Sequence, residues 1–169
     1  MRWLIDGYNV IRRDPDLRAR EAESLETGRT ALLRLVAGVA RASGDPFVVV
    51  FDGARRTGGT PVGAPGAQVQ AIFSRPPESA DDVLVRLAAQ WREGAIVVSA
   101  DRTVHGAARR AGAVAVTTDE FLAALDVDGD EGDEPDEPAR ASGAPRGNPH
   151  RLSRDARAVQ RVLRRLRPR

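Results

Sequence analysis

The stretch LIDGYNVI, residues 4–11, decides how this chain is expected to fold. Two apolar residues run directly into Asp6, which is followed by a glycine, an aromatic residue and an amide. An apolar run followed by an acid also occurs in PFVVVFDG at 46–53 and in AIVVSAD at 95–101. Continuous apolar runs of this length are typical of strands that helices cover on both faces. The chain is therefore expected to contain a parallel sheet.

Segments with helical periodicity alternate with these short strands along the first 125 residues. The alternation predicts an α/β fold, with a central, mostly parallel sheet flanked by helices, over residues 1–125. The expected strands lie at 3–5, 47–51, 68–74, 95–98 and 113–117, and the expected helices at 25–41, 80–91, 107–110 and 119–125. A chain of 169 residues with 41% hydrophobic residues is long enough for one such core.

Charge is unevenly distributed along the chain. The net charge is only +2, and all 26 basic residues are arginine. Residues 126–139 carry eight acids and no base, whereas residues 140–169 carry ten arginines and a single acid, Asp155. Separated blocks of opposite charge are typical of interaction tails, and an anionic polymer is the natural partner of the basic block.

The composition also bears on the cellular compartment. No cysteine is present, which excludes disulfides and thiolate metal sites. The apolar opening is short and is interrupted by Asp6, so neither a signal peptide nor a membrane span is predicted. We therefore expect a soluble, cytoplasmic protein without a membrane partner.

Two segments are expected after the α/β domain. Residues 126–150 are crowded with Asp, Glu, Gly and Pro and are predicted to form a disordered linker. Residues 151–169 place apolar side chains at helical spacing, with Ser153 as a cap and arginines on the other face, which predicts a basic amphipathic helix. Such a helix could contact RNA or a ribosome, or dock on the domain. Membrane binding ranks last because aromatic anchors are missing.

Acids follow three of the predicted strands. Asp6, Asp52 and Asp101 stand where apolar runs end, and Asp81 opens the helix that leads to the third of these strands. Each alone could cap a helix or a turn. Strand ends in an open parallel sheet meet at one edge, however, and carboxylates gathered there repel one another unless a cation neutralises them. Oxygen donors suit Mg²⁺ or Mn²⁺, which could activate water and hold a phosphodiester.

Local spacing separates the neighbouring acids of the SADD motif. Ser79 as N-cap puts Asp82 at the third helical position, the spacing of a capping box, so Asp82 is assigned to the helix terminus. Asp81 lies about 100° around the helix and is expected to face the cleft. The same spacing assigns Glu120 to a cap, whereas Asp119 stays undecided.

Four motifs in a fixed order resemble those of the YacP-like branch of NYN domains, which are nucleases related to PIN domains. They are LIDGYNVI at 4–11, VVVFDG at 48–53, VQAIFS at 69–74 followed by ESADD at 78–82, and VVSAD at 97–101. The resemblance covers residues 1–125, and the ordered set is specific where DGYN alone would not be. It implies a PIN-like Rossmannoid sheet and a divalent-metal endoribonuclease, with some relatives acting on messenger RNA in a ribosomal context.

The resemblance also implies roles for particular residues. Asp6, Asp81 and Asp101 fall at the family's metal-binding positions. Asn9 belongs to the same signature as Asp6, and Asp52 matches the Phe-Asp pair of the family. We expect both to belong to the catalytic site as support for the metal ligands.

Five further residues are candidates for contact with RNA. Arg55 and Arg56 lie in a long loop rich in glycine and proline, where paired arginines would suit phosphates. Arg75, Arg102 and Ser99 lie close in sequence to the predicted acids, and the hydroxyl of Ser99 could hydrogen-bond either a carboxylate or a phosphate. Each of them could equally lie in a solvated loop or an ordinary turn without contacting RNA.

The leading prediction is a metal-dependent endoribonuclease acting on single-stranded or messenger RNA. The alternative is a non-catalytic adaptor that binds RNA or the ribosome through the basic tail. A small-molecule phosphatase is a weaker third possibility. The aspartyl-phosphate class would need an aspartate two residues after Asp6, where this chain has Tyr8.

Overall fold

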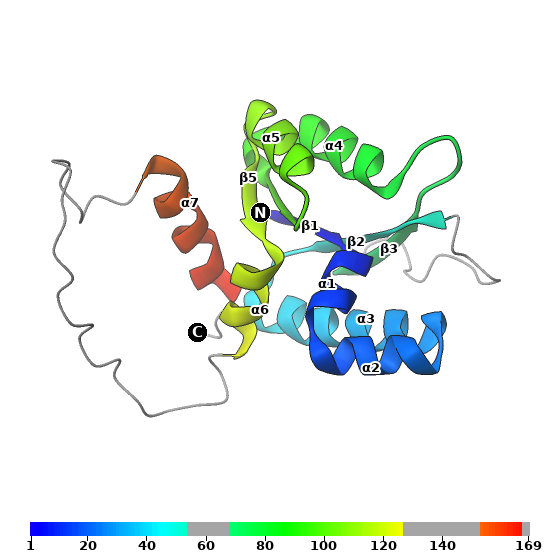
Figure 1. Cartoon of the computed structure of the whole chain (residues 1–169). Helices are drawn as coiled ribbons and strands as arrows, with labels where there is room; N and C mark the ends of the chain where they lie inside the picture. Colours follow the sequence, from blue (N-terminus) through cyan, green and yellow to red (C-terminus); the bar gives the residue numbers. More distant parts are fainter. Residues whose placement is uncertain (54–67, 127–152, 167–169) are drawn as a thin grey trace, which may run out of the picture.

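The computed structural model describes residues 1–53, 68–126 and 153–166 and confirms the α/β prediction. Five strands form one sheet in the order β3-β2-β1-β4-β5, and every pairing is parallel. Helices cover both faces of the sheet (Figure 1). The elements are β1 (Arg2–Asp6), α1 (Gly7–Arg13), α2 (Pro15–Glu23), α3 (Leu25–Ser43), β2 (Phe47–Phe51), β3 (Val69–Phe73), α4 (Ala80–Trp91), η2 (Arg92–Gly94), β4 (Ala95–Ser99), α5 (Arg102–Arg110), β5 (Val114–Thr117), α6 (Thr118–Asp126), α7 (Arg154–Leu163) and η4 (Arg164–Leu166).

The two faces of β1 are buried against different helices. Trp3 and Ile5 belong to the hydrophobic cluster that includes side chains of α1, α3, α6 and α7, and Trp3 stacks on Phe47. Leu4 belongs to the second cluster, with side chains of α4 and α5. Successive strand residues point to opposite faces, so burial on both sides requires consecutive apolar residues. This explains why the apolar runs that precede the acids are continuous in the sequence.

The sequence reasoning missed two helices, α1 and α2. Helix α1 begins at Gly7, immediately after β1, because the carboxylate of Asp6 caps it. Gly7 is required at this place since a Cβ would lie 2.3 Å from Cε1 of Phe51. Helix α2 is capped by Asp14 and buries only Leu17, so it has almost no apolar periodicity to detect. Both helices lie between β1 and α3 in the chain, where no element had been predicted.

The basic C-terminal helix docks on the α/β domain. Ser153 caps α7 as predicted, and Val159, Val162 and Leu166 are buried in the same cluster as Trp3. Docking, one of the possibilities raised by the sequence, is therefore confirmed. Residues 127–152, which include nearly all of the predicted linker, lie outside the described residues, and Asp126 is the last residue of α6.

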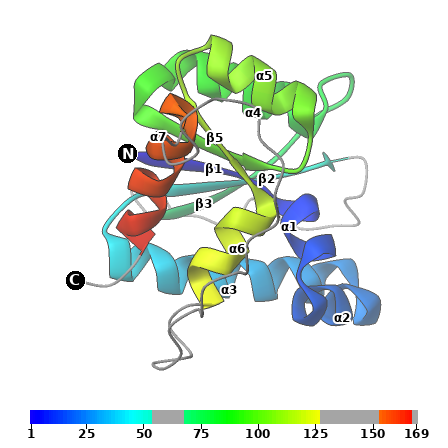
Figure 2. The same ribbon diagram turned by 60° about the vertical axis from the view of Figure 1, so that its left-hand side comes forward.

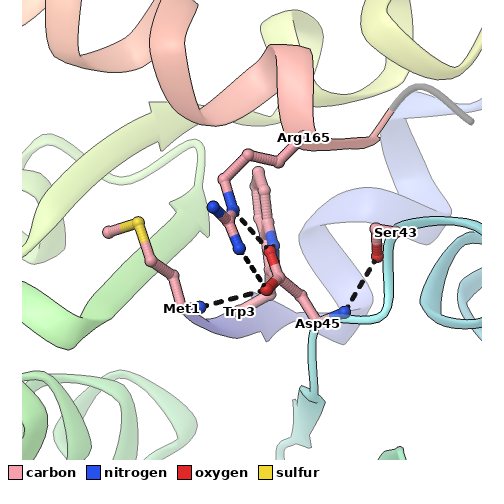
Figure 3. Close-up of polar contacts among 5 residues, drawn as sticks. All are labelled: Met1, Trp3, Ser43, Asp45 and Arg165. Carbon is pink, nitrogen blue, oxygen red and sulfur yellow. Dashed lines mark hydrogen bonds and ion pairs between the residues drawn. The ribbon is translucent and has the colours of Figure 1, made fainter. Parts of the chain in front are cut away.

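A polar contact fastens the end of this helix to the sheet. Arg165 of η4 donates to both carboxylate oxygens of Asp45, at 2.8 and 2.6 Å (Figure 3). Asp45 lies just before the start of β2 and therefore at the amino edge of the sheet. In the part of the chain that the structure describes, no helix has the length and apolar character needed to cross a membrane.

Candidate functional site

The carboxyl edge of the sheet contains a cleft at the point where the strand order reverses. After β1 the chain builds β2 and β3 on one side, and β4 and β5 lie on the other, so a crevice is expected beyond β1 and β4. A cleft of about 170 Å³ is found beside the end of β1. It is lined by Asp6, Tyr8, Asn9, Arg12, Asp52, Ser79, Ala80 and Asp81.

Asp6 is a buried carboxylate held by its neighbours. Its side chain accepts hydrogen bonds from the backbone N–H of Asn9 at 3.3 Å, from the side-chain amide of Asn9, and from the hydroxyl of Ser99 at 3.2 Å. Only 6% of Asp6 is exposed. Burial raises the pKa of Asp6 despite these bonds and the charge of Arg12, which act in the opposite direction. A raised pKa means that the environment lacks sufficient compensating positive charge.

Asp81 enters the cleft from the first turn of α4. Ser79 and Asp82 form the predicted capping box, since each side chain bonds the backbone N–H of the other residue. Asp82 is thereby held at the helix terminus, and Asp81 lines the cleft as the sequence indicated. Burial raises the pKa of Asp81, and four neighbouring carboxylates raise it further. These four are Asp6, Asp101, Asp82 and Asp52.

Asp101 lies near this group but is used differently. Its carboxylate caps α5 by accepting from the backbone N–H groups of Thr103 at 2.5 Å and Val104 at 3.3 Å, which lower its pKa. It is absent from the cleft lining, although its charge is felt by Asp81. The capping alternative therefore holds for Asp101, and it contributes to the cleft through its negative charge.

Ser99 connects the ends of β1 and β4. Its hydroxyl donates to Asp6 and accepts from the backbone N–H of Asp101 at 3.1 Å. Ser99 has no exposed surface, and of the two contacts expected for it, with a carboxylate or with a phosphate, the structure shows the one with a carboxylate. Ser99 orients the carboxylate of Asp6.

Asp52 lines the cleft from the end of β2. The hydroxyl of Ser74 donates to its carboxylate at 3.4 Å and accepts from the backbone N–H of Gly53 at 3.0 Å. The backbone of Gly53 passes so close to Ser74 that a Cβ would lie 1.8 Å from the Ser74 carbonyl oxygen. This close approach of two strand ends fixes where Asp52 emerges.

Neither of the two predicted basic residues that the structure describes, Arg75 and Arg102, belongs to the cleft lining. Both are exposed, on the segments that precede α4 and open α5. Arg55 and Arg56 lie outside the described residues. The undecided Asp119 makes an exposed, two-bond ion pair with Arg13, and neither residue belongs to the cleft lining.

Two cleft residues were missed or undervalued from the sequence. Among the described residues, Arg12 is the only cationic side chain in the cleft lining, and its guanidinium carbon lies 5.7 Å from the centre of the Tyr8 ring. Tyr8 packs edge-on against Phe51 and also lines the cleft. Asn9 and Arg12 are three residues apart on α1 and so share one helix face. If Asp6 is taken as an N-cap, the sequence predicts a helix that begins at Gly7 and places Arg12 on the same face as Asn9.

The cleft carboxylates supply the donor chemistry of a hard divalent cation. Within residues 1–53, 68–126 and 153–166, no three histidine or acidic side chains are grouped so as to hold a metal ion together. Mg²⁺, however, is commonly bound by one or two carboxylates with water and substrate phosphate. Asp6 and Asp81 meet that smaller requirement, because both line the cleft and the charge of Asp6 raises the pKa of Asp81.

Known proteins resemble both the sequence and the fold. Uncharacterized protein YacP of Bacillus subtilis (strain 168) is 34% identical over 85 residues, which are 50% of this chain and 49% of that protein. The match thus spans about half the length of this curated relative. Two crystal structures of Rae1 (YacP) from Bacillus subtilis cover 75% of this chain. One is 28% identical with a TM-score of 0.63 over 74% of its chain, and the other, of a mutant form, is 26% identical with a TM-score of 0.61 over 75%.

A family model provides the widest match. The model of the YacP-like NYN domain matches residues 3–165, which include the whole sheet except Arg2 and most of the docked C-terminal helix. The five-stranded parallel sheet with helices on both faces agrees with the structures of Rae1 and with a PIN-like fold. The chain belongs to the YacP-like NYN domain family, a family of nuclease-like domains.

Proposed function

We propose that this protein is a divalent-metal-dependent endoribonuclease whose active site is the cleft at the carboxyl edge of the sheet. The observation that supports this most is the pair of cleft carboxylates, Asp6 and Asp81, whose pKa values are raised by burial and, for Asp81, by neighbouring negative charge. Such a pair is unfavourable until a cation joins it. The nuclease-like character of the family agrees with a phosphodiester substrate.

Asp6 and Asp81 would hold Mg²⁺ or Mn²⁺, and Asp52 and Asp101 would add negative charge around it. A metal bound there would polarise the phosphate and lower the pKa of an attacking water. Asn9 and Ser99 keep the Asp6 carboxylate in one orientation through their hydrogen bonds. This orientation matters because a ligand misplaced by a fraction of an ångström loses much of its effect.

Binding of RNA requires positive charge around an acidic cleft. Arg12 is placed to contact a phosphate in the cleft, since it lines the cleft and is exposed. Arg75 and Arg102 are exposed nearby and would contact the flanking backbone, as would Arg55 and Arg56. Contacts of this kind position the strand without reading its sequence.

Cleavage of single-stranded RNA in the presence of Mn²⁺ tests the proposal. Mn²⁺ should raise the melting temperature of the wild type, and the Asp6→Asn variant should lose both this rise and cleavage. Asp14→Asn is the matched control, because Asp14 caps α2 as Asp6 caps α1 but lies outside the cleft lining. Cleavage in Asp6→Asn at the wild-type rate would refute the proposed site.

The adaptor alternative keeps one supporting observation, the exposed arginines of the docked helix α7. An adaptor would bind RNA with or without Mn²⁺ and would leave it intact, so the same assay separates the two functions. Messenger RNA in a ribosomal context remains, for this chain, a prediction from the family resemblance.

A further inference from the structure

The outer face of α7 and η4 presents a stripe of arginines. Arg154, Arg157, Arg161 and Arg164 are exposed and follow one another at intervals of three or four residues. At about 100° per residue, the first three fall within about 60° of arc, so they point in one direction. We call these four residues the arginine stripe.

The arginine stripe has no neutralising partner among the described residues. Asp155 is the one acid between residues 153 and 166, and it pairs with Arg109 at 3.7 Å. Arg165, the fifth arginine of the segment, is bonded to Asp45. The helix thus uses one arginine to dock and leaves four in solvent.

Docking makes the stripe a fixed surface rather than a loose tail. Val159, Val162 and Leu166 are buried on the opposite side of the helix, and Arg165 is held at Asp45 (Figure 3). Side chains carried by a preformed surface lose less freedom on binding than those of a segment that must first fold. Natural partners of such a stripe are polymers with regularly spaced negative charges.

Helix α7, which carries the stripe, and the cleft lie at opposite ends of β1. Both ribbon views place α7 beside the start of β1, whereas α1, which contributes cleft residues, begins where β1 ends (Figure 1; Figure 2). The cleft itself attracts polyanions poorly, because its lining carries three acids and one arginine. Affinity for a nucleic acid must therefore come from charges outside it.

We propose that the arginine stripe of α7 is a second RNA-binding surface. It binds the phosphate backbone of one part of a long RNA while another part of the same RNA occupies the cleft. From Arg154 to Arg164 the stripe spans about 15 Å of helix, comparable to about four nucleotide steps of a stacked strand. RNA as the occupant rests on the proposed function. The binding measurement below needs no catalysis, so the two can fail separately.

The test compares two triple variants of the full chain with the same loss of charge. One carries Arg157→Gln, Arg161→Gln and Arg164→Gln, and the control carries Arg18→Gln, Arg34→Gln and Arg41→Gln, which are exposed on α2 and α3. Glutamine keeps a good helix former at each position. Binding of a labelled long RNA and of a labelled hexanucleotide is followed by fluorescence anisotropy in EDTA over a series of salt concentrations.

The stripe variant should bind the long RNA about tenfold more weakly or worse, and its salt slope should fall by about 2, or about 0.7 for each lost phosphate contact. The hexanucleotide should bind both variants alike. Equal losses in the stripe and control variants would mean that only net charge matters and would overturn the proposal. Unchanged RNA binding in a folded stripe variant would also overturn it and would point to an acidic protein as the occupant.

Discussion

The two edges of the sheet treat buried carboxylates in opposite ways. At the amino edge, Asp45 is 4% exposed and contacts two cations, the Met1 amine at 3.0 Å and the Arg165 guanidinium, as well as the indole N–H of Trp3 at 3.3 Å (Figure 3). At the carboxyl edge, Asp6 is 6% exposed and receives only neutral hydrogen bonds, with Arg12 acting from a distance.

The pKa values of Asp45 and Asp6 are shifted in opposite directions. Burial acts to raise the pKa of Asp45, but the bonds from Arg165 and the N-terminal amine outweigh it and lower the pKa to about 2. Burial raises the pKa of Asp6, and nothing there reverses it. The chain itself neutralises Asp45, whereas Asp6 is left without a direct cationic partner, as we propose for a carboxylate that binds a metal ion.

The largest effect is expected at the carboxyl edge, on cleavage. Asp81→Asn should lower kcat/KM for RNA by about 100-fold or more, because it removes one of two proposed metal ligands. Asp82→Asn is the matched control, one residue away on the same helix. It disturbs the capping box and should lower stability slightly while kcat/KM changes less than about threefold. Equal losses in the two variants would mean that the site depends on the helix terminus as a whole.

At the amino edge, the large effect should be on stability instead. Asp45→Ala leaves the indole of Trp3 without its acceptor and releases Arg165, so we expect the free energy of unfolding to fall by about 2–4 kcal/mol. Chemical denaturation measures this. Asp119→Ala, which breaks the exposed pair with Arg13, should change stability little. The cleavage rate of folded Asp45→Ala should match the wild type, because Asp45 is remote from the cleft.

The residues at these two edges show which parts of the fold and of the candidate site could be predicted from the sequence. Strands, the grouping of Asp6, Asp52 and Asp81, and the capping roles of Asp82 and Glu120 followed from local patterns: apolar runs, strand ends and a spacing of three residues. The capping pairs are visible because their atoms lie three residues apart in the chain, whereas the grouping of Asp6, Asp52 and Asp81 follows from the rule that parallel strands end at one edge of the sheet.

The role of Asp45 could not be predicted, because its partners are residues 1, 3 and 165 and no local pattern connects them. Asp101 illustrates a different limit. Its position after a strand indicated the edge correctly, but whether its carboxylate turned towards the cleft or towards the amides of α5 depended on backbone geometry. Position along the chain predicts which edge an acid reaches and not which group it meets.

Stability should depend on pH with opposite signs at the two edges. The pKa of Asp45 in the fold, about 2, is below its usual 3.8, so its contribution of about 2 kcal/mol is fully present above pH 3.8 and is lost as the pH falls through about 2. The pKa of Asp6 is raised in the folded protein, so above that pKa the ionised carboxylate lowers the free energy of unfolding. This loss of stability disappears as the pH falls below 3.8, because Asp6 is then protonated in the folded and the unfolded protein alike.

Urea unfolding at several pH values checks this. The stability advantage of the wild type over Asp45→Asn should shrink between about pH 4 and pH 2. Any advantage of Asp6→Asn over the wild type should also shrink on acidification, but at higher pH. Parallel pH profiles for the two variants would contradict the contrast between the edges.

The smallest expected effect concerns Arg12, the one cleft residue that could make the carboxyl edge resemble the amino edge. If Arg12 neutralised Asp6 as Arg165 neutralises Asp45, Arg12→Gln would lower stability and leave RNA binding unchanged. We expect the reverse, because Arg12 is exposed, lines the cleft and acts on Asp6 through its charge, whereas Arg165 bonds Asp45 directly. Arg12→Gln should raise KM for RNA about tenfold, with kcat and the melting temperature nearly unchanged.

Arg13→Gln supplies the control for Arg12, since it removes the same charge from the next residue of α1, where the guanidinium is bound to Asp119 instead of facing the cleft. KM should then stay within about twofold of the wild type, because a charge outside the cleft contributes only through the weaker, screened field around the protein. A similar rise in KM for both variants would show that α1 attracts RNA by its total charge. A fall in melting temperature confined to Arg12→Gln would instead assign this arginine to the fold, and the two edges would differ in degree only.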